Sequence, residues 1–540
     1  MASQEAGILS PGSSTPLSTS PDNDKSPDLE RLGRQRPALL PTWLTEAAFV
    51  FTIVASMMMS EYFISGFNII LPAVATALDI PDSARTWPAA VINLTTACLL
   101  LPFARLADRH GGRIVFLAGH LWLVIWSLVS GFAQNPVMLI VCRAMQGLGP
   151  SAFMPAGLAL LARTYRPGPR KNIVFSLYGA FACIGFYVGI LLGAVSVEFL
   201  TWRWYFWIGT IMSFVVLVSG YFSIPKDLGD DDETVTMDWL GLATIVPGLV
   251  LVVFAFADGG HAPQGWKTPY VYVTLILGVL FLAAAVYVQG WVSKNPLLPA
   301  ELFRPKYMKR LSLALFCAYG VFGLFLFYAS FYIETALRVG PLLAAAWFTP
   351  LAVGGMVLAI TGGFIMHILP NRVLMLISMT GFLLSVLLFA VIPSREDAPG
   401  GLTFLYWAYI FPAMLCGTIG VDITFNITNV FITTAMPAKL QSTAGGMINS
   451  LLYLGMAFWL GVGELAVSST VMTQGEANVG LDKQYRIGFY TATGLAGVAL
   501  LLVATIKMGK AEAGMTADEK ADMERELEAV RAREGGDERV

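Results

Sequence analysis

The chain has 540 residues, of which 56% are hydrophobic and 13% are charged, and its formal net charge is -2. Soluble domains carry about 25% charged residues, so this composition excludes an ordinary soluble protein and indicates a multi-pass membrane protein. No basic stripe is present, which argues against a nucleic-acid partner.

Two polar tails flank the apolar region. Residues 1–44 are rich in Ser, Pro and Asp and lack the layout of a cleavable signal peptide, so they predict a disordered cytoplasmic tail. Residues 509–540 predict a charged cytoplasmic tail with helical propensity, either solvated or used for docking. The cysteines all fall inside apolar runs without CxxC spacing, so we expect a packing role for them, with no metal site and no cofactor.

Runs of about 20 apolar residues, the length that crosses a bilayer, predict fourteen membrane-spanning helices in an order of six, two and six. The first eight are expected at 45–72, 88–104, 114–132, 137–161, 173–197, 205–223, 239–257 and 270–292. The last six are expected at 311–334, 344–367, 373–392, 403–431, 441–470 and 487–507.

The distribution of Lys and Arg between the gaps predicts the orientation. Fifteen of these residues fall in gaps on the side of the termini, and seven fall in the opposite gaps. Since cytoplasmic loops carry the excess of positive charge, we expect both termini in the cytoplasm, with the plasma membrane as the location.

A cluster of charged residues lies in the short gap between the second and third spans. The segment ARLADRHGGRIVF resembles the G-x-L-a-D-r-x-G-r-r signature of the major facilitator superfamily. The matching residues are Asp108, Arg109, Gly111 and Arg113. We expect a tight glycine turn and a gating loop, in which Asp108 meets a cation or a helix N-terminus. The alternative is a merely solvated cytoplasmic loop.

The fourth span carries an arginine inside the membrane. The segment CRAMQGLGPSAFMPAG resembles the R-x-x-q-G-x-g pattern of the same superfamily through Arg143, Gln146, Gly147 and Gly149. An arginine at this depth needs a partner or a wet cavity. The resemblance implies a part in proton coupling for Arg143; the alternative is an arginine that only ties this span to backbone carbonyls of a neighbour.

The fifth span has glycines at every fourth position, Gly185, Gly189 and Gly193, which predict close helix packing. This segment resembles the G-x-x-x-G-P-x-x-G-G signature of drug:proton antiporters, but Ile190 replaces the proline and Ala194 the last glycine. These two departures weaken the implication of antiport.

Taken together, the fourteen spans and these motifs are similar to the fourteen-spanner drug:proton antiporter family. The second half resembles its fungal branch of aminotriazole-resistance, boron-efflux and low-affinity ammonium transporters. The resemblance implies an all-α major facilitator fold of two six-helix bundles with two extra central helices. We expect an N-terminal bundle over 45–223, a linker with the two extra helices over 224–306, and a C-terminal bundle over 307–508.

Ionisable residues inside spans are functional candidates because burying each one in a bilayer costs a few kcal/mol. Glu61 lies near the middle of the first span, two residues before the position at which the family pattern has its acid. We expect Glu61 to face a cavity, with a structural pair to another span as the alternative. Glu334 and Glu464 could serve as gate or interface residues, or as neither.

The span at 403–431 carries a polar stripe. Thr418, Asp422, Asn426 and Asn429 follow at helical spacings of four, four and three, so they share one face. We predict that Asp422, Asn426 and Asn429 line a proton or substrate path. The alternative is a seam of hydrogen bonds between packed helices. We expect the aromatic residues of the seventh span mainly to pack.

No nucleotide-binding P-loop and no hydrolase motif is present, so the sequence predicts neither an ATP-driven transporter nor an enzyme. We expect a monomeric secondary transporter that exports a drug-like or secondary-metabolite small molecule in exchange for protons by alternating access. Two alternatives stay open: uptake or facilitated flux of a small polar solute such as ammonium or borate, and a sensor without turnover.

Overall fold

The computed structural model describes residues 36–506 apart from 38, 82–83, 166–168, 227–235, 261, 437 and 476–478. The predicted C-terminal tail at 509–540, and residues 1–35 of the predicted N-terminal tail, lie outside the described residues.

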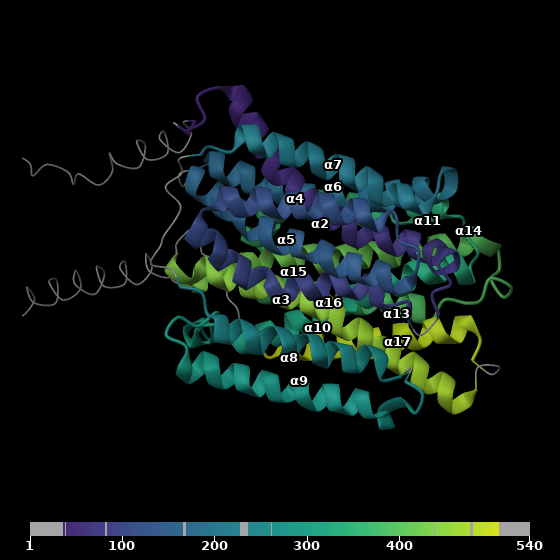
Figure 1. The fold of residues 1–540 in the computed structure, drawn as a ribbon. Coiled ribbons are helices and arrows are strands. Elements are labelled where there is room, and N and C mark those ends of the chain that lie inside the picture. Colours follow the sequence, from purple (N-terminus) through teal and green to yellow (C-terminus); the bar gives the residue numbers. More distant parts are fainter. Residues whose placement is uncertain are drawn as a thin grey trace, which may run out of the picture.

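Within the described residues the fold is a bundle of long helices (Figure 1). In the part of the chain that the structure describes, fourteen stretches are long and apolar enough to cross a membrane, which confirms the predicted all-α polytopic fold. The first eight spans contain α2 (Trp43–Ala77), α3 (Trp87–His110), α4 (Gly112–Ser130), α5 (Pro136–Thr164), α6 (Pro169–Phe199), α7 (Trp202–Ser223), α8 (Trp239–Asp258) and α9 (Pro269–Tyr287). The last six contain α10 (Met308–Phe331), α11 (Pro341–Trp347) with α12 (Thr349–Ile368), α13 (Asn371–Ala390), α14 (Gly401–Leu405) with α15 (Phe411–Ala435), α16 (Ala438–Gln474) and α17 (Leu481–Ala504).

Local sequence explains where several helices begin. The first N–H groups of a helix have no partner within it, so a side-chain oxygen placed before the helix stabilises the start. Thr42 accepts from the Thr45 amide at 3.2 Å at the start of α2. Asn135 accepts from the Met138 amide at 2.8 Å at the start of α5. Helices dominate because a bilayer offers backbone groups no other hydrogen-bond partners.

Two spans that the sequence predicts as single helices are divided. The predicted helix at 344–367 is split between α11 and α12 at Phe348, just before Pro350. The predicted helix at 403–431 contains a π-helical turn at Tyr406–Ile410, just before Pro412. Proline cannot donate the backbone hydrogen bond to the residue four positions earlier and its ring crowds that carbonyl, so each helix breaks or widens there.

The spans form two halves, and most helices pack mainly on other helices of their own half. In the first half α2 packs on α6 and α7, and α5 packs on α3 and α4. In the second half α10 packs on α16 and α17, and α13 and α12 pack on α15. The halves meet where α16 contacts α3 and where α6 contacts α11 and α12. Because the number of spans is even, α2 begins and α17 ends at the same end of the bundle, called here the terminal side.

The two helices between the halves form a peripheral insert. Figure 1 shows α8 and α9 side by side at one edge, and α8 packs on both α16 and α3. In the span that contains α9, only 17% of an apolar stretch of 18 residues is buried inside the protein. In the span that contains α10 and the π-helical turn Tyr332–Ala336, the buried share is 83%. Helix α9 therefore faces the lipid, and α10 is central. On the terminal side the Arg105 guanidinium donates to the Asn295 carbonyl at 2.7 Å and to the Pro296 carbonyl. This contact joins the end of α3 to the segment after the insert.

Candidate functional site

The candidate site is a cavity of about 130 Å³ between the two halves. Helices α2 and α6 of the first half and α10, α12, α15 and α16 of the second half supply its walls. The lining residues are Met57, Glu61, Ile64, Gly179, Ala182, Cys183, Phe186, Tyr319, Phe322, Leu351, Ala352, Gly355, Thr418, Val421, Asp422, Phe425, Asn449, Leu452, Tyr453 and Met456. The lining includes two carboxyl groups and five aromatic rings, and none of these described residues is basic.

Glu61 lines this cavity from α2, as the sequence predicts for a cavity-facing acid. Its neighbours on the same helical face, Met57 and Ile64, are apolar and also line the cavity. Among the described residues no side chain or backbone group forms a hydrogen bond or ion pair with its carboxylate. Glu61 is therefore an acid in an apolar wall that only a bound proton or ligand can neutralise.

Asp422 lines the cavity from α15 in the opposite half, and it has partners. The Cys183 thiol of α6 donates to its Oδ1 at 3.7 Å, and the Thr418 hydroxyl lies 3.5 Å from its Oδ2. The Thr418 hydroxyl also donates to the Leu351 carbonyl. A Cβ atom on Gly355 would lie 2.9 Å from Asp422 Oδ2, so only a glycine lets α12 approach this carboxylate without displacing it.

The rest of the predicted polar stripe leads away from the cavity. Thr418 and Asp422 are lining residues, whereas Asn426 is half-buried and Asn429 is exposed, and neither lines the cavity. Since α15 runs toward the terminal side, the stripe extends from the cavity in that direction. The structure thus brings Glu61 and Asp422 to one cavity and leaves the two asparagines beyond it.

Arg143 lies outside the cavity lining and is fully buried in α5. Its Nε donates to the Pro88 carbonyl at 3.1 Å, and one terminal nitrogen donates to the Phe63 carbonyl at 2.9 Å. That nitrogen also donates to Gln146 at 3.1 Å, and the guanidinium lies 3.9 Å from the centre of the Phe67 ring. These contacts tie α5 to the backbone of α2 and α3. The carbonyl that Arg143 binds on α2 belongs to Phe63, which lies two residues after Glu61.

The predicted gating loop makes contacts within the first half. Asp108 at the end of α3 pairs with Arg163 at the end of α5 at 3.4 Å, and both side chains are about 40% exposed. Arg113 donates to the Tyr221 carbonyl of α7 at 2.9 Å. Gly111 joins α3 to α4 with a φ of 85°, a conformation that other residues rarely adopt, and Arg109 beside it is exposed. The loop thus links the terminal-side ends of four helices.

The glycine stripe of α6 lies directly on α2. Cβ atoms on Gly185, Gly189 and Gly193 would come within 2.4, 2.6 and 3.0 Å of backbone atoms of α2. Ile190, which replaces the proline of the antiporter signature, is fully buried. Backbone contact at these positions makes α2 and α6 one packed unit that holds the Glu61 and Cys183 sides of the cavity together.

The other acidic and aromatic candidates divide between the cavity and the surrounding core. Glu334 and Glu464 do not line the cavity. On α10, Tyr319 and Phe322 line it, while Phe325 packs on Phe389, so the expected packing role holds for only part of the aromatic set.

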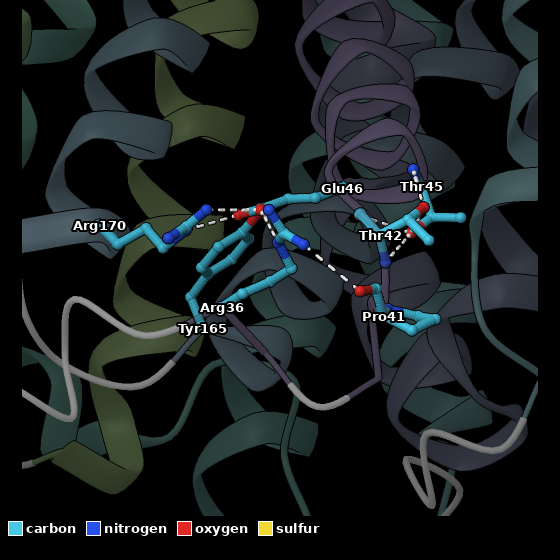
Figure 2. A network of polar contacts seen from close by, with 7 residues as sticks. All are labelled: Arg36, Pro41, Thr42, Thr45, Glu46, Tyr165 and Arg170. Atoms are coloured by element: carbon cyan, nitrogen blue, oxygen red, sulfur yellow. Dashed lines mark hydrogen bonds and ion pairs between the residues drawn. The ribbon is translucent and has the colours of Figure 1, made fainter.

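Sequence reasoning missed three residues that the structure brings into prominence. Cys183 and Gly355 surround Asp422, but each lies on a different helix from that acid, so no spacing in the chain links them. The third is Glu46 near the start of α2 (Figure 2). Arg170 donates two hydrogen bonds to this carboxylate, each at 2.6 Å, while Arg36 and Tyr165 donate at 3.1 and 3.0 Å.

Among the described residues no group of His, Cys, Asp and Glu could hold a metal ion. Comparisons with known proteins identify the family of the chain and proteins with a similar fold. The sequence matches the Major Facilitator Superfamily over residues 50–460.

Two of the relatives that match most of this chain are fungal transporters. The low affinity ammonium transporter of Saccharomyces cerevisiae is 31% identical over 480 residues, which is 87% of this chain and 90% of that protein. Efflux pump terJ of Aspergillus terreus is 30% identical over 468 residues, which is 85% of this chain and 87% of that protein. The resemblance to fungal transporters of this kind is thus confirmed.

Among solved structures, an auto-inhibited peptide transporter of the POT family superposes with a TM-score of 0.63 at 14% identity. The match covers 87% of this chain and 99% of that protein. At this identity the likeness concerns the fold alone.

Proposed function

Because this chain belongs to the Major Facilitator Superfamily, whose members move small molecules across membranes, we propose that it is a proton-coupled exporter of a drug-like or secondary-metabolite molecule. The observation that carries the proposal is the cavity between the halves, where each half contributes one carboxyl group, Glu61 and Asp422. Alternating access of that cavity to the two sides would move its contents.

The lining favours a neutral or cationic amphipathic substrate. Carboxylates repel anions and attract cations, and the aromatic faces of Tyr319, Phe322 and Phe425 bind both apolar groups and cations. No basic side chain in the described lining would compensate a bound anion. The relative named as an efflux pump supports export.

Proton coupling follows from competition for the two carboxylates. A bare charge in an apolar cavity within a membrane costs a few kcal/mol, so each carboxylate is most stable with either a proton or a cationic substrate beside it. A proton that arrives from outside would displace the substrate and then favour the return of the empty carrier. Coupling requires that proton and substrate bind the two carrier states with different affinities.

We further propose that the terminal side is cytoplasmic and that the protein acts as a monomer in the plasma membrane. The excess of Lys and Arg in the terminal-side gaps supports this orientation. Outward release then requires separation of the contacts on the other side of the cavity. These include the hydrogen bond between Tyr187 and Thr349 at 2.8 Å and the contact of the Phe186 and Phe322 rings at 6.0 Å.

A second candidate function is flux of a small cation such as ammonium. Two observations favour it: the relative named as a low affinity ammonium transporter, and a cavity of only about 130 Å³. Both functions use the same carboxylates, but they differ in the size of the substrate and in the need for proton exchange.

Purified protein in liposomes tests the two functions. If the protein is the exporter, an imposed proton gradient should drive accumulation of a fluorescent organic cation. The proton gradient should fall in step, with one proton crossing for each cation accumulated. Methylammonium flux that runs down its own gradient and leaves the proton gradient unchanged would instead support the second function. Absence of both fluxes in liposomes that contain folded protein would refute transport.

A further inference from the structure

Three helices, α6, α12 and α15, meet at the Asp422 carboxylate, and their contact joins the two halves across the cavity. The Cys183 thiol of α6 donates to Asp422 Oδ1 at 3.7 Å. A Cβ atom on Gly355 of α12 would lie 2.9 Å from Asp422 Oδ2 and 3.3 Å from Cys183 Sγ, so α12 lies directly against both groups. Because α6 belongs to the first half and α15 to the second, this hydrogen bond crosses the boundary between the halves.

The surroundings of Asp422 leave the Cys183 thiol as its donor. The Thr418 hydroxyl lies 3.5 Å from Asp422 Oδ2, but it has one proton, which it donates to the Leu351 carbonyl. Among the described residues no further side chain donates to this carboxylate. Since a thiol is a weak donor, the carboxylate remains available to a proton or a cation from the cavity.

The other titratable side chains near Asp422 line the same cavity from other helices. They are Glu61 of α2, Tyr319 of α10 and Tyr453 of α16, whereas the described lining from α12 contains none. Helix α13 packs on the far face of α15, where the neutral Ser378 binds its backbone. In the described part of the chain no cation is paired with Asp422, so its charge is balanced by no permanent positive charge.

We propose that Cys183 is a positioning residue through which the charge of Asp422 controls the contact between the halves, an inference that rests on the proposed uptake of a proton by Asp422. Hydrogen bonds to an ionised acceptor are roughly twice as strong as those between neutral groups. The thiol therefore binds α6 to α15 while Asp422 is ionised, and this contact weakens when the carboxyl takes up a proton. The contact between Tyr187 and Thr349, by comparison, joins the halves through neutral groups.

Infrared difference spectra of the purified full-length protein across a series of pH values test the inference without any transport measurement. The band of the protonated Asp422 carboxyl is identified by its absence in Asp422→Asn. In the wild type it should grow as the pH falls, and the S–H band of Cys183 should shift with the same midpoint. Because a donor favours the ionised form of a carboxylate, Cys183→Ala should raise the midpoint of the carboxyl band by about half a pH unit. Cys183→Ser, which restores a donor, should return the midpoint toward the wild-type value.

A second variant keeps both the thiol and the carboxyl. Gly355→Ala places a methyl group against both, so the hydrogen bond should lengthen and the midpoint should rise, as in Cys183→Ala. Cys416→Ala on α15 and Gly497→Ala on α17 are the matched controls, because both residues lie outside the cavity lining. Both controls should keep the wild-type midpoint.

The possible results separate this inference from the proposed function. An S–H band that stays fixed while the carboxyl band titrates, or an unchanged midpoint in Cys183→Ala or Gly355→Ala, would overturn the role of Cys183 and leave Asp422 as a proton site. An equal shift in the controls would show an effect of general packing and would also overturn that role. A wild-type carboxyl band that does not change with pH would overturn both this inference and the proposed proton uptake by Asp422.

Discussion

Two carboxylates on the same helix, Glu46 and Glu61, have opposite surroundings. Glu46 near the start of α2 binds Arg36, Tyr165 and Arg170. Glu61 lies fifteen residues further along, about 22 Å along the axis, and lines the cavity without a hydrogen-bond partner among the described residues. A carboxylate that already has cations and donors contributes to structure, whereas one without partners is available to a proton or a substrate.

The contrast is sharpest when the two residues lose their charge in the same way. Glu61→Gln should lower proton-coupled transport about 10- to 100-fold, the effect of losing a hydrogen bond or ion pair to a charged group in the transport cycle. Glu46→Gln should transport nearly normally per folded molecule. Flux in liposomes at matched protein content measures both, and normal coupled flux in Glu61→Gln would remove this residue from the proton path.

A designed partner for Glu61 should convert it into a residue of the Glu46 type. Met57 precedes Glu61 by one helical turn and also lines the cavity, so Met57→Arg places a guanidinium within reach of the carboxylate. We expect about a tenfold loss of pH-dependent flux because the carboxylate then has a permanent cation. Met57→Leu is the control for packing, and a variant with an unaltered pH profile would contradict the competition mechanism.

Stability should show the reverse order of sensitivity. Glu46→Gln leaves two arginines without their shared carboxylate and should destabilise the protein by about 1 to 2 kcal/mol, a value kept small because both arginines are a third exposed. Glu61→Gln breaks no contact and should be neutral or stabilising. Thermal unfolding in detergent measures both; a larger loss in Glu61→Gln would reverse the assignment of structural and functional roles.

The smallest effect concerns pH. The hydrogen bond to Glu46 raises the pKa of Arg170 above its ordinary value, and burial raises the pKa of Tyr165 above its ordinary value of 10. A group whose pKa is raised in the folded state contributes its full stabilisation at any pH below its ordinary pKa. That contribution is lost only as the pH rises through the raised pKa. The stability difference between wild type and Glu46→Gln should therefore vary by no more than about 0.5 kcal/mol from pH 6 to 9.

Unfolding at both ends of this pH range checks the expectation, with transport as the contrasting measurement. Flux should change with pH over the same interval while the stability difference stays flat. A stability difference that fell steeply between pH 6 and 9 would mean that the Glu46 network titrates there and is not permanently paired.

The predictions from sequence succeeded where a signal repeats along the chain. All fourteen spans found among the described residues follow from apolar length, and the family follows from the motifs around Asp108 and Arg143. Glu61 and Asp422 could be singled out because an acid inside a span is rare. The breaks at Phe348 and at Tyr406–Ile410 were missed because a proline within an apolar run also occurs in unbroken helices, such as α2 with Pro72.

What the sequence determined alone is the number of spans, the family and the rarity of its buried acids, since each depends on residues close together in the chain. Tertiary structure decided that Glu61 and Asp422 share a cavity and that Glu46 is the acid paired with arginines. It also decided that Arg143 binds backbone carbonyls beside that cavity. Glu46 and Arg170 are 124 residues apart, and Cys183 and Asp422 are 239 apart. Contacts at such separations depend on how the helices pack, because short-range spacing contains no information about which helix faces which.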